Sequence, residues 1–161
     1  TYKYNRINFM KNITSIILIL FLYSCGYSSI YKNQKSQNFK INIIEAKGNS
    51  EMNNLIKNEI KLYSGKDTEN IYNLKIDTDY LKETLTKDSA GLITDYKLSV
   101  TSTFTIVLKE KTKVIELKET INIKNQSDSF EQNTYEKNIK RSFASSIREK
   151  LISEILNIND N

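Results

Sequence analysis

Closely spaced acidic residues are the side chains of this chain that are best suited to acid or base chemistry. Asp77 and Asp79 stand two residues apart, and Glu116 and Glu119 stand three apart. Two neighbouring carboxyl groups can serve as a general acid and a general base. The residues around Asp77 and Asp79 alternate between apolar and polar, however, so both carboxylates fall on the solvent side of a strand. The pattern favours a solvated face over a catalytic pair.

Other catalytic constellations lack their essential residues. The chain has no histidine, which excludes imidazole acid–base chemistry, histidine metal sites and histidine-based triads. Ser64-Gly65-Lys66 matches only the end of a phosphate-binding loop, lacks the earlier glycine and follows a helical pattern instead of a strand. We therefore expect a protein that is not an enzyme and needs no cofactor or metal.

The positive charge of the chain is concentrated near its start. The net charge is +5, but Lys3, Arg6 and Lys11 precede the first apolar run without any acidic neighbour, and removing these three leaves 21 basic against 19 acidic residues. Nucleic-acid binding requires a clustered basic face. The evenly mixed charges of the remaining chain argue against a nucleic-acid partner.

The first 24 residues have the composition of a secretory signal peptide. Lys11 supplies a basic start, the uncharged run from Ile13 to Leu22 is too short to span a bilayer, and Ser24 is a small residue at the expected cleavage point. Position 1 is Thr, whereas Met10 would be a compact start, so we interpret residues 1–9 as an upstream extension.

Cys25 is the only cysteine, and it follows this apolar run directly. Leu22-Tyr23-Ser24-Cys25 resembles a bacterial lipobox, in which the cysteine is acylated and becomes the mature N-terminus. A single acyl chain binds a membrane only marginally, and the resemblance implies three. Gly26 stands where an aspartate would retain such a protein at the inner membrane, so the resemblance points to the outer membrane. Mass spectrometry of the mature N-terminus would test this assignment.

Apolar periodicity predicts one α+β domain after a polar tether at residues 25–38. A helix with Ser50 as its N-cap should end near Gly65, a turn is expected at Ser89-Ala90-Gly91, and a last helix should bury Tyr135, Ile139, Phe143 and the residues that continue this row. Alternation predicts strands around 39–43, 72–80, 96–108 and 115–123, and the last helix spans 129–156. The domain covers 39–157 with a tail at 158–161, in the order β-α-β-β-β-α, with both helices on one face of a four-stranded mixed or antiparallel sheet.

From Cys25 to Leu156 the chain resembles the lipopolysaccharide-assembly lipoprotein E family, LptE. The resemblance rests on Cys25-Gly26-Tyr27, on the run from Gly91 to Leu98 that leads into a long alternating strand, and on the last helix. It implies a lipid-anchored protein on the periplasmic side of the outer membrane. Such proteins plug the β-barrel of LptD, assist its assembly and contact lipopolysaccharide.

Two alternative functions remain open from the sequence. One is an auxiliary lipoprotein of a lipid-trafficking ABC or mammalian-cell-entry-type transporter, and the other is a pilotin-like chaperone of a secretin. Co-purification of a large outer-membrane barrel would distinguish the first interpretation from both.

Lysines near predicted loops are the candidate contacts for lipopolysaccharide, which carries anionic phosphate on its lipid A. Long cationic side chains at loop ends can reach such a ligand without opening the core. Lys82 and Lys87 fall in an expected turn at 82–91, and Lys109, Lys111 and Lys113 fall in an expected hairpin tip. Nearby acids, including Glu83, Asp88 and Glu110, dilute the local potential, so the alternative that these are surface lysines stays open.

Overall fold

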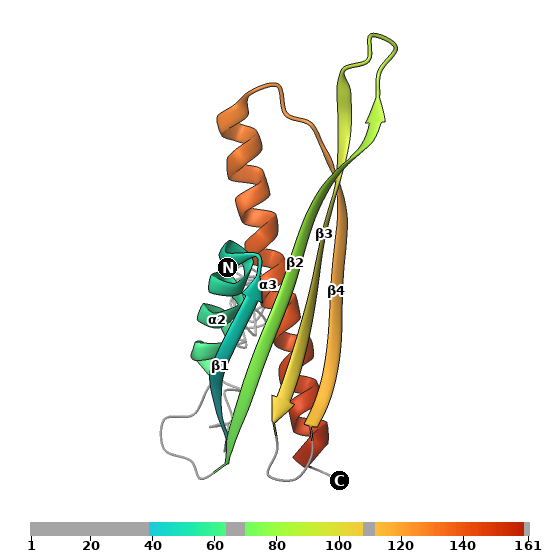
Figure 1. Cartoon of the computed structure of the whole chain (residues 1–161). Helices are drawn as coiled ribbons and strands as arrows, with labels where there is room; N and C mark the ends of the chain where they lie inside the picture. Colours follow the sequence, from blue (N-terminus) through green and yellow to red (C-terminus); the bar gives the residue numbers. More distant parts are fainter. Residues whose placement is uncertain (1–38, 64–69, 108–111, 160–161) are drawn as a thin grey trace, which may run out of the picture. The chain divides into compact units, whose positions relative to one another are not determined.

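The computed structural model describes residues 39–63, 70–107 and 112–159, which belong to one compact unit. Within it, the chain forms a four-stranded sheet and two helices in the order that the sequence predicts. The elements are β1 (Lys40–Gly48), α2 (Ser50–Tyr63), β2 (Ile71–Lys87), β3 (Ile93–Val107), β4 (Thr112–Lys124) and α3 (Ser129–Asn159) (Figure 1). The predicted signal peptide, Cys25, the tether, Gly65, Lys109 and Lys111 lie outside the described residues.

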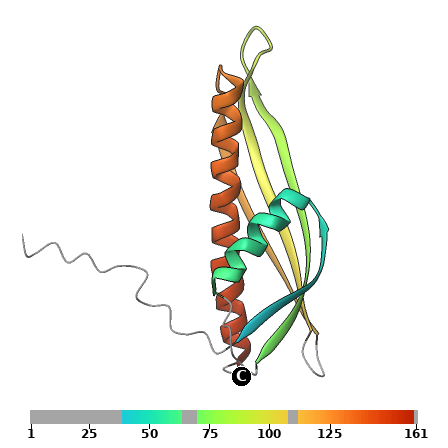
Figure 2. The ribbon, with the colours of Figure 1, turned by 90° about the vertical axis from the view of Figure 1, so that its left-hand side faces the viewer.

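The sheet is mixed. Its strands follow the order β1-β2-β3-β4; β1 pairs with β2 in parallel, and the other neighbours are antiparallel. A parallel pair needs a crossover connection, which α2 supplies, whereas β2, β3 and β4 follow one another through hairpins. Both of these helices lie on the same face of the sheet, and no helix of the described residues lies on the opposite face (Figure 2).

Alternating side chains of β2 and β3 build the core. Leu74 and Ile76 from β2, and Phe104 and Ile106 from β3, are almost completely buried, while the residues between them face the other side. Thr78 and Ser102 are directly opposite each other within this buried face, and their hydroxyl oxygens lie 3.1 Å apart in a hydrogen bond. The predicted period-2 pattern is confirmed, and its polar members are paired in the core.

The junction between β1 and α2 depends on Gly48 and Asn49. Gly48 has a φ of 79°, and a Cβ atom there would lie 2.1 Å from the carbonyl oxygen of Thr78, so no larger residue fits without displacing the backbone. The side chain of Asn49 accepts a hydrogen bond of 3.0 Å from the backbone N–H of Met52. Asn49, rather than the predicted Ser50, is therefore the N-cap of α2.

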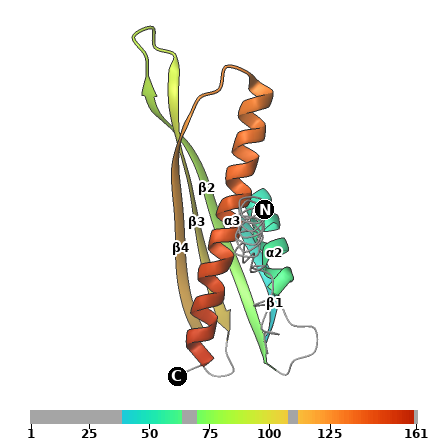
Figure 3. The ribbon, with the colours of Figure 1, turned by 180° about the vertical axis from the view of Figure 1, so that it is seen from behind.

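Helix α3 runs along one face of the sheet (Figure 3). Most of the apolar row that the sequence predicts is buried there. Phe143, Ile147, Leu151 and Ile155 are buried, together with Ala144 and Ile152. Tyr135, predicted to begin the row, is 38% exposed, while Gln132 is buried at 8%. The prediction was wrong at this end, because the first turns of α3 meet the sheet through polar groups.

A pair of phenylalanines on α3 tests where the core ends. Phe143 is 6% exposed and Phe130 is 76% exposed. Replacing Phe143 by Ala should cost ~3 kcal/mol or more through lost burial and a residual cavity. Phe130→Ala removes the same atoms on the same helix, but we expect the free energy of unfolding to change by less than ~0.5 kcal/mol. Equal midpoints in urea denaturation for the two variants would contradict this placement.

Candidate functional site

The face of the sheet opposite the helices is a candidate binding surface, because no described helix covers it (Figure 2). Its centre is formed by one side of β3, where Ser99, Thr101, Thr103 and Thr105 follow one another at alternate positions. Hydroxyl side chains with β-branching suit strands and remain compatible with water. We call this surface the uncovered face; it is defined by these four residues and the outward side chains of the neighbouring strands.

Both signs of charge flank the central hydroxyl row. On β1 and β2 the uncovered face carries Glu45, Lys47, Lys75 and Asp77, and its charged residues on β4 are Glu116, Lys118 and Lys124. Such a surface favours contact with a polar, hydrated partner, because neither sign dominates.

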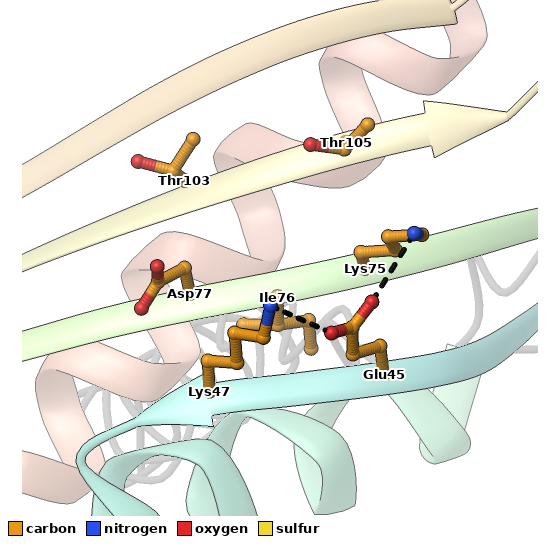
Figure 4. A pocket seen from close by; sticks show the side chains of 7 residues that line it. All are labelled: Glu45, Lys47, Lys75, Ile76, Asp77, Thr103 and Thr105. Carbon is orange, nitrogen blue, oxygen red and sulfur yellow. Dashed lines mark ion pairs between the residues drawn. The ribbon is translucent and has the colours of Figure 1, made fainter.

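A hollow of ≈ 250 Å³ lies on the uncovered face over β1, β2 and β3 (Figure 4). The carboxylate of Glu45 lies between two ammonium groups, 2.9 Å from Nζ of Lys47 and 3.1 Å from Nζ of Lys75. Hydrogen bonds from Lys47 and Lys75 lower the pKa of Glu45, and the carboxylate of Glu45 raises the pKa of Lys47. Asp77, Thr103 and Thr105 complete the rim.

The hollow suits polar recognition better than catalysis. All its charged groups are exposed, and the shifts in pKa stabilise the ionised forms of Glu45 and Lys47, so neither group is poised to exchange a proton near neutral pH. In residues 39–159, outside the two internal gaps, no group of three or more acidic side chains could hold a metal ion. No helix in this same part of the chain is both long enough and apolar enough to cross a membrane.

On the helix side, charged and aromatic residues replace the apolar core toward the β2–β3 turn. Lys82 forms an ion pair with Glu136 of α3, and its Nζ lies 4.1 Å from the centre of the Tyr96 ring. Lys140 bonds Glu51 at 2.6 Å, and its Nζ lies 4.7 Å from the centre of the Tyr80 ring. These contacts join α3 and the start of α2 to the part of β2 and β3 nearest the turn at residues 88–92. We call the six residues involved the polar clamp: Glu51, Tyr80, Lys82, Tyr96, Glu136 and Lys140.

The ionisation of the polar clamp follows from its partial burial. Burial, with a contribution from the nearby carboxylates of Glu136 and Glu51, raises the pKa of Tyr80 to about 12. Burial also acts to raise the pKa of Glu136, but hydrogen bonds from Lys82 and Gln132 and the charges of Lys82 and Lys140 outweigh it, so the pKa is lowered. Glu136 is therefore ionised, and Tyr80 neutral, throughout the physiological range.

Glu119 interrupts the predicted apolar side of β4, and it is likewise a partly buried carboxylate that is held by partners on α3. Its carboxylate accepts a hydrogen bond of 2.6 Å from the hydroxyl of Ser146 and lies 2.7 Å from Nζ of Lys150, both on α3. Burial acts to raise its pKa, yet Lys150 and Ser146 outweigh this effect and lower it. Glu119 thus anchors α3 to the strand and is not half of an acid pair with Glu116, which is exposed on the opposite side.

The structure separates the predicted lipopolysaccharide contacts. Lys82 belongs to β2 rather than to a turn, because the strand extends to Lys87, and its side chain is committed to the polar clamp. Lys113 belongs to β4 rather than to a hairpin tip, and it pairs with Glu154 of α3 at 3.1 Å. Residues 88–92 form the actual turn, at the far end of β3 from Lys113, as the strand register shows. Lys82 and Lys113 therefore do not lie in a single patch.

Lys87 lies next to the turn at residues 88–92. It is exposed at the last position of β2, and within the described part of the chain it makes no ion pair. Sequence reasoning missed Glu136, Lys140 and Gln132 as members of a packed cluster. The available signal was their spacing, since Gln132, Glu136 and Lys140 stand four residues apart on the helix side that continues toward Phe143.

Comparison with known proteins gives the fold but no family. No family model and no curated protein matches the chain. The rare lipoprotein B of Shewanella oneidensis has a similar structure, with a TM-score of 0.54 and 17% identity over 73% of this chain and 99% of that protein. A minor lipoprotein of Acinetobacter baumannii gives a TM-score of 0.46 at 13% identity, over 68% of this chain and 93% of that protein. At these identities the likeness concerns the fold alone.

The polar clamp leads to a prediction about the Lys82–Glu136 pair. A double-mutant cycle with Lys82→Met and Glu136→Gln should give a coupling energy of about 1 kcal/mol at neutral pH. Because the pKa of Glu136 is lower in the folded than in the unfolded state, this stabilisation is complete above the ordinary glutamate range and is lost as pH falls through the lowered pKa. Urea denaturation of the four proteins across acidic pH measures it.

The exposed pair Lys97–Glu83, whose charged atoms lie 3.6 Å apart, is the matched control. Its cycle with Lys97→Met and Glu83→Gln should give nearly zero coupling, because solvent screens both groups. A coupling for Lys82–Glu136 that is no larger than the control, or that persists in acid, would contradict the assignment of the polar clamp.

Proposed function

We propose that this protein is a lipid-anchored accessory subunit of an outer-membrane β-barrel of the LptD type, which it helps to assemble and partly fills. The observation that carries the proposal is the uncovered face, a wide sheet surface with hydroxyl groups at its centre and balanced charges around it. The lumen of a large membrane barrel is polar and water-filled, so a plug needs a hydrated surface of this kind. The lipobox-like segment ending at Cys25 would place the domain at the membrane.

The fold is compatible with this role. Rare lipoprotein B, whose fold the chain shares, is described as a lipoprotein, and the shared region covers nearly all of that protein. Packing both helices on one side of the sheet gives the domain a rigid apolar interior and leaves the other side free for a large contact. An accessory protein that binds its partner through an extended surface needs a rigid fold more than it needs a pocket.

A substitution at the centre of the uncovered face tests the proposed barrel contact. Thr103 lies between the hollow and β4, and Thr103→Arg adds bulk and charge to the solvent side without entering the core. We expect this variant to lose co-purification with a barrel of LptD size while keeping its melting temperature. Asn133→Arg, an equal change at an exposed position of α3, should retain the barrel.

Co-purification of the wild-type chain decides between the classes of partner. Recovery of a large outer-membrane barrel that is lost with Thr103→Arg supports the proposal. Recovery of a secretin, or of inner-membrane transporter subunits, in place of such a barrel would overturn it in favour of the alternative accessory roles.

We further propose that the domain contacts lipopolysaccharide through Lys87. The ammonium group of Lys87 stands next to the β2–β3 turn, where an anionic phosphate can approach without displacing an ion pair. Lys87→Glu should weaken binding of purified lipopolysaccharide about threefold or more, with unchanged thermal unfolding, and added salt should weaken the wild type in the same direction.

The control for Lys87 is Lys61→Glu, which makes the same charge change at an exposed position in the last turn of α2. It should bind lipopolysaccharide as the wild type does. Equal weakening by both variants would indicate an effect of net charge and not a contact at Lys87, and no weakening by either would remove Lys87 from the proposal.

A further inference from the structure

Strand β2 extends well beyond its neighbour β1. β1 ends at Gly48, which pairs with Thr78, whereas β2 continues to Lys87. Among the described strands, none lies beside this continuation on the side of β1 (Figure 1). The register with β3 is regular up to Thr84 and shifts after it. We call the regular segment Asp79–Thr84 the open edge.

The backbone groups of the open edge that point away from β3 pair with no described strand, and their positions can be derived from β1. The carbonyl oxygen of Asn70 accepts a hydrogen bond of 2.7 Å from Lys40, and that of Thr78 accepts one of 2.6 Å from Asn49. Alternate residues of a strand direct their N–H and C=O groups to the same neighbour. Even-numbered residues of β2 therefore point toward the side of β1, so Tyr80, Lys82 and Thr84 present N–H and C=O groups at the open edge.

The outward side chains of the open edge have a distinct charge pattern. Asp79, Leu81 and Glu83 share the uncovered face, and Leu81 is 49% exposed. Asp79 makes no ion pair in the described part of the chain, and Glu83 makes only the exposed, 3.6 Å contact with Lys97. Two carboxylates thus flank an exposed leucine at alternate positions along a strand whose edge is unpaired.

The two other free edges of the sheet differ from the open edge. Strand β1 is interrupted by a register shift between Ile43 and Glu45, which limits continuous pairing along its length. Strand β4 carries Glu116 and Lys118 side by side on its outward face, so it offers no preference for a partner of one charge.

We propose that the open edge binds an extended segment of another protein by strand addition. Main-chain hydrogen bonds to Tyr80, Lys82 and Thr84 would supply affinity, and side chains at alternate positions would supply specificity. Charge complementarity to Asp79 and Glu83 requires Lys or Arg two positions before and after an apolar residue that contacts Leu81. This inference does not depend on the proposed barrel, because it concerns an edge and not the centre of the uncovered face.

Residue-resolved amide exchange of the full chain in detergent micelles tests this proposal directly. The probe is a synthetic peptide with a central valine, lysines two positions before and after the valine, and threonines at the positions between them. The comparison peptide has glutamates in place of the lysines. The lysine peptide should slow exchange of the Tyr80, Lys82 and Thr84 amides by about tenfold or more near saturation. The Leu81 and Glu83 amides point toward β3 and should change much less.

Charge variants test specificity. Asp79→Lys and Glu83→Lys should each weaken binding of the lysine peptide about threefold or more, and the double variant should prefer the glutamate peptide. Glu116→Lys makes the same charge change on the same sheet face at β4, and should leave binding unchanged. Melting temperatures of all variants are measured to confirm folding.

Three outcomes would overturn the proposal. They are failure of the lysine peptide to bind the wild type, equal slowing at odd-numbered and even-numbered amides of β2, and an unchanged peptide preference in the folded double variant. Slower exchange of β4 amides in place of β2 amides would show that the peptide adds to a different edge, and would also refute the inference. Because the probe is a peptide, none of these results depends on the proposed barrel.

Discussion

Antiparallel hydrogen bonding between β2 and β3 runs from the pair Asn73–Val107 to the pair Lys87–Ile93, and it determines which side chains meet the helices. A shift of β3 by one residue against β2 would turn Phe104 toward solvent and bring Thr105 toward the core. The buried Thr78–Ser102 hydrogen bond adds a polar constraint on the same register, since each hydroxyl would otherwise be buried without its partner. The positions of α2, α3 and the uncovered face all follow from this pairing.

Covering only one side of the sheet has opposite consequences for the two faces. On the helix side, α3 is held by apolar packing near Phe143 and Ile147, and by charged contacts at Glu119 and in the polar clamp. On the other side, the threonines of β3 and charges of both signs remain in contact with water, while Ser99 is buried. The same alternation of residues that builds the core therefore also builds the surface on which the proposed function rests.

The sequence predicts the fold well where burial produces a periodic signal. Residues 72–80 and 96–106 alternate because one side of each strand is buried, and the pattern predicts the buried side of both correctly. The signal is lost beyond Tyr80, where residues on both faces of β2 are exposed, so the sequence wrongly predicts a turn at Lys82. Apolar spacing also could not identify Glu136 as a packed residue, because its partner Lys82 on β2 is distant in the sequence. Gln132 escapes the same signal because it packs through polar contacts with Gln126 and Glu136.

The polar clamp has a further consequence for how the domain moves. Near Phe143 the sheet and α3 exclude water, so separating them would expose apolar surface at a large cost in free energy. Around Lys82 and Glu136 the same two elements are joined by groups that water can also solvate, so separation there costs less. Partial unfolding should therefore begin in the half of β2 nearest the turn at residues 88–92 and in the first turns of α3. It should stop at the apolar core around Phe143. The region near Phe143 is therefore rigid, and the region around Lys82 and Glu136 is easier to deform. A partner could change the conformation of the second region without unfolding the first.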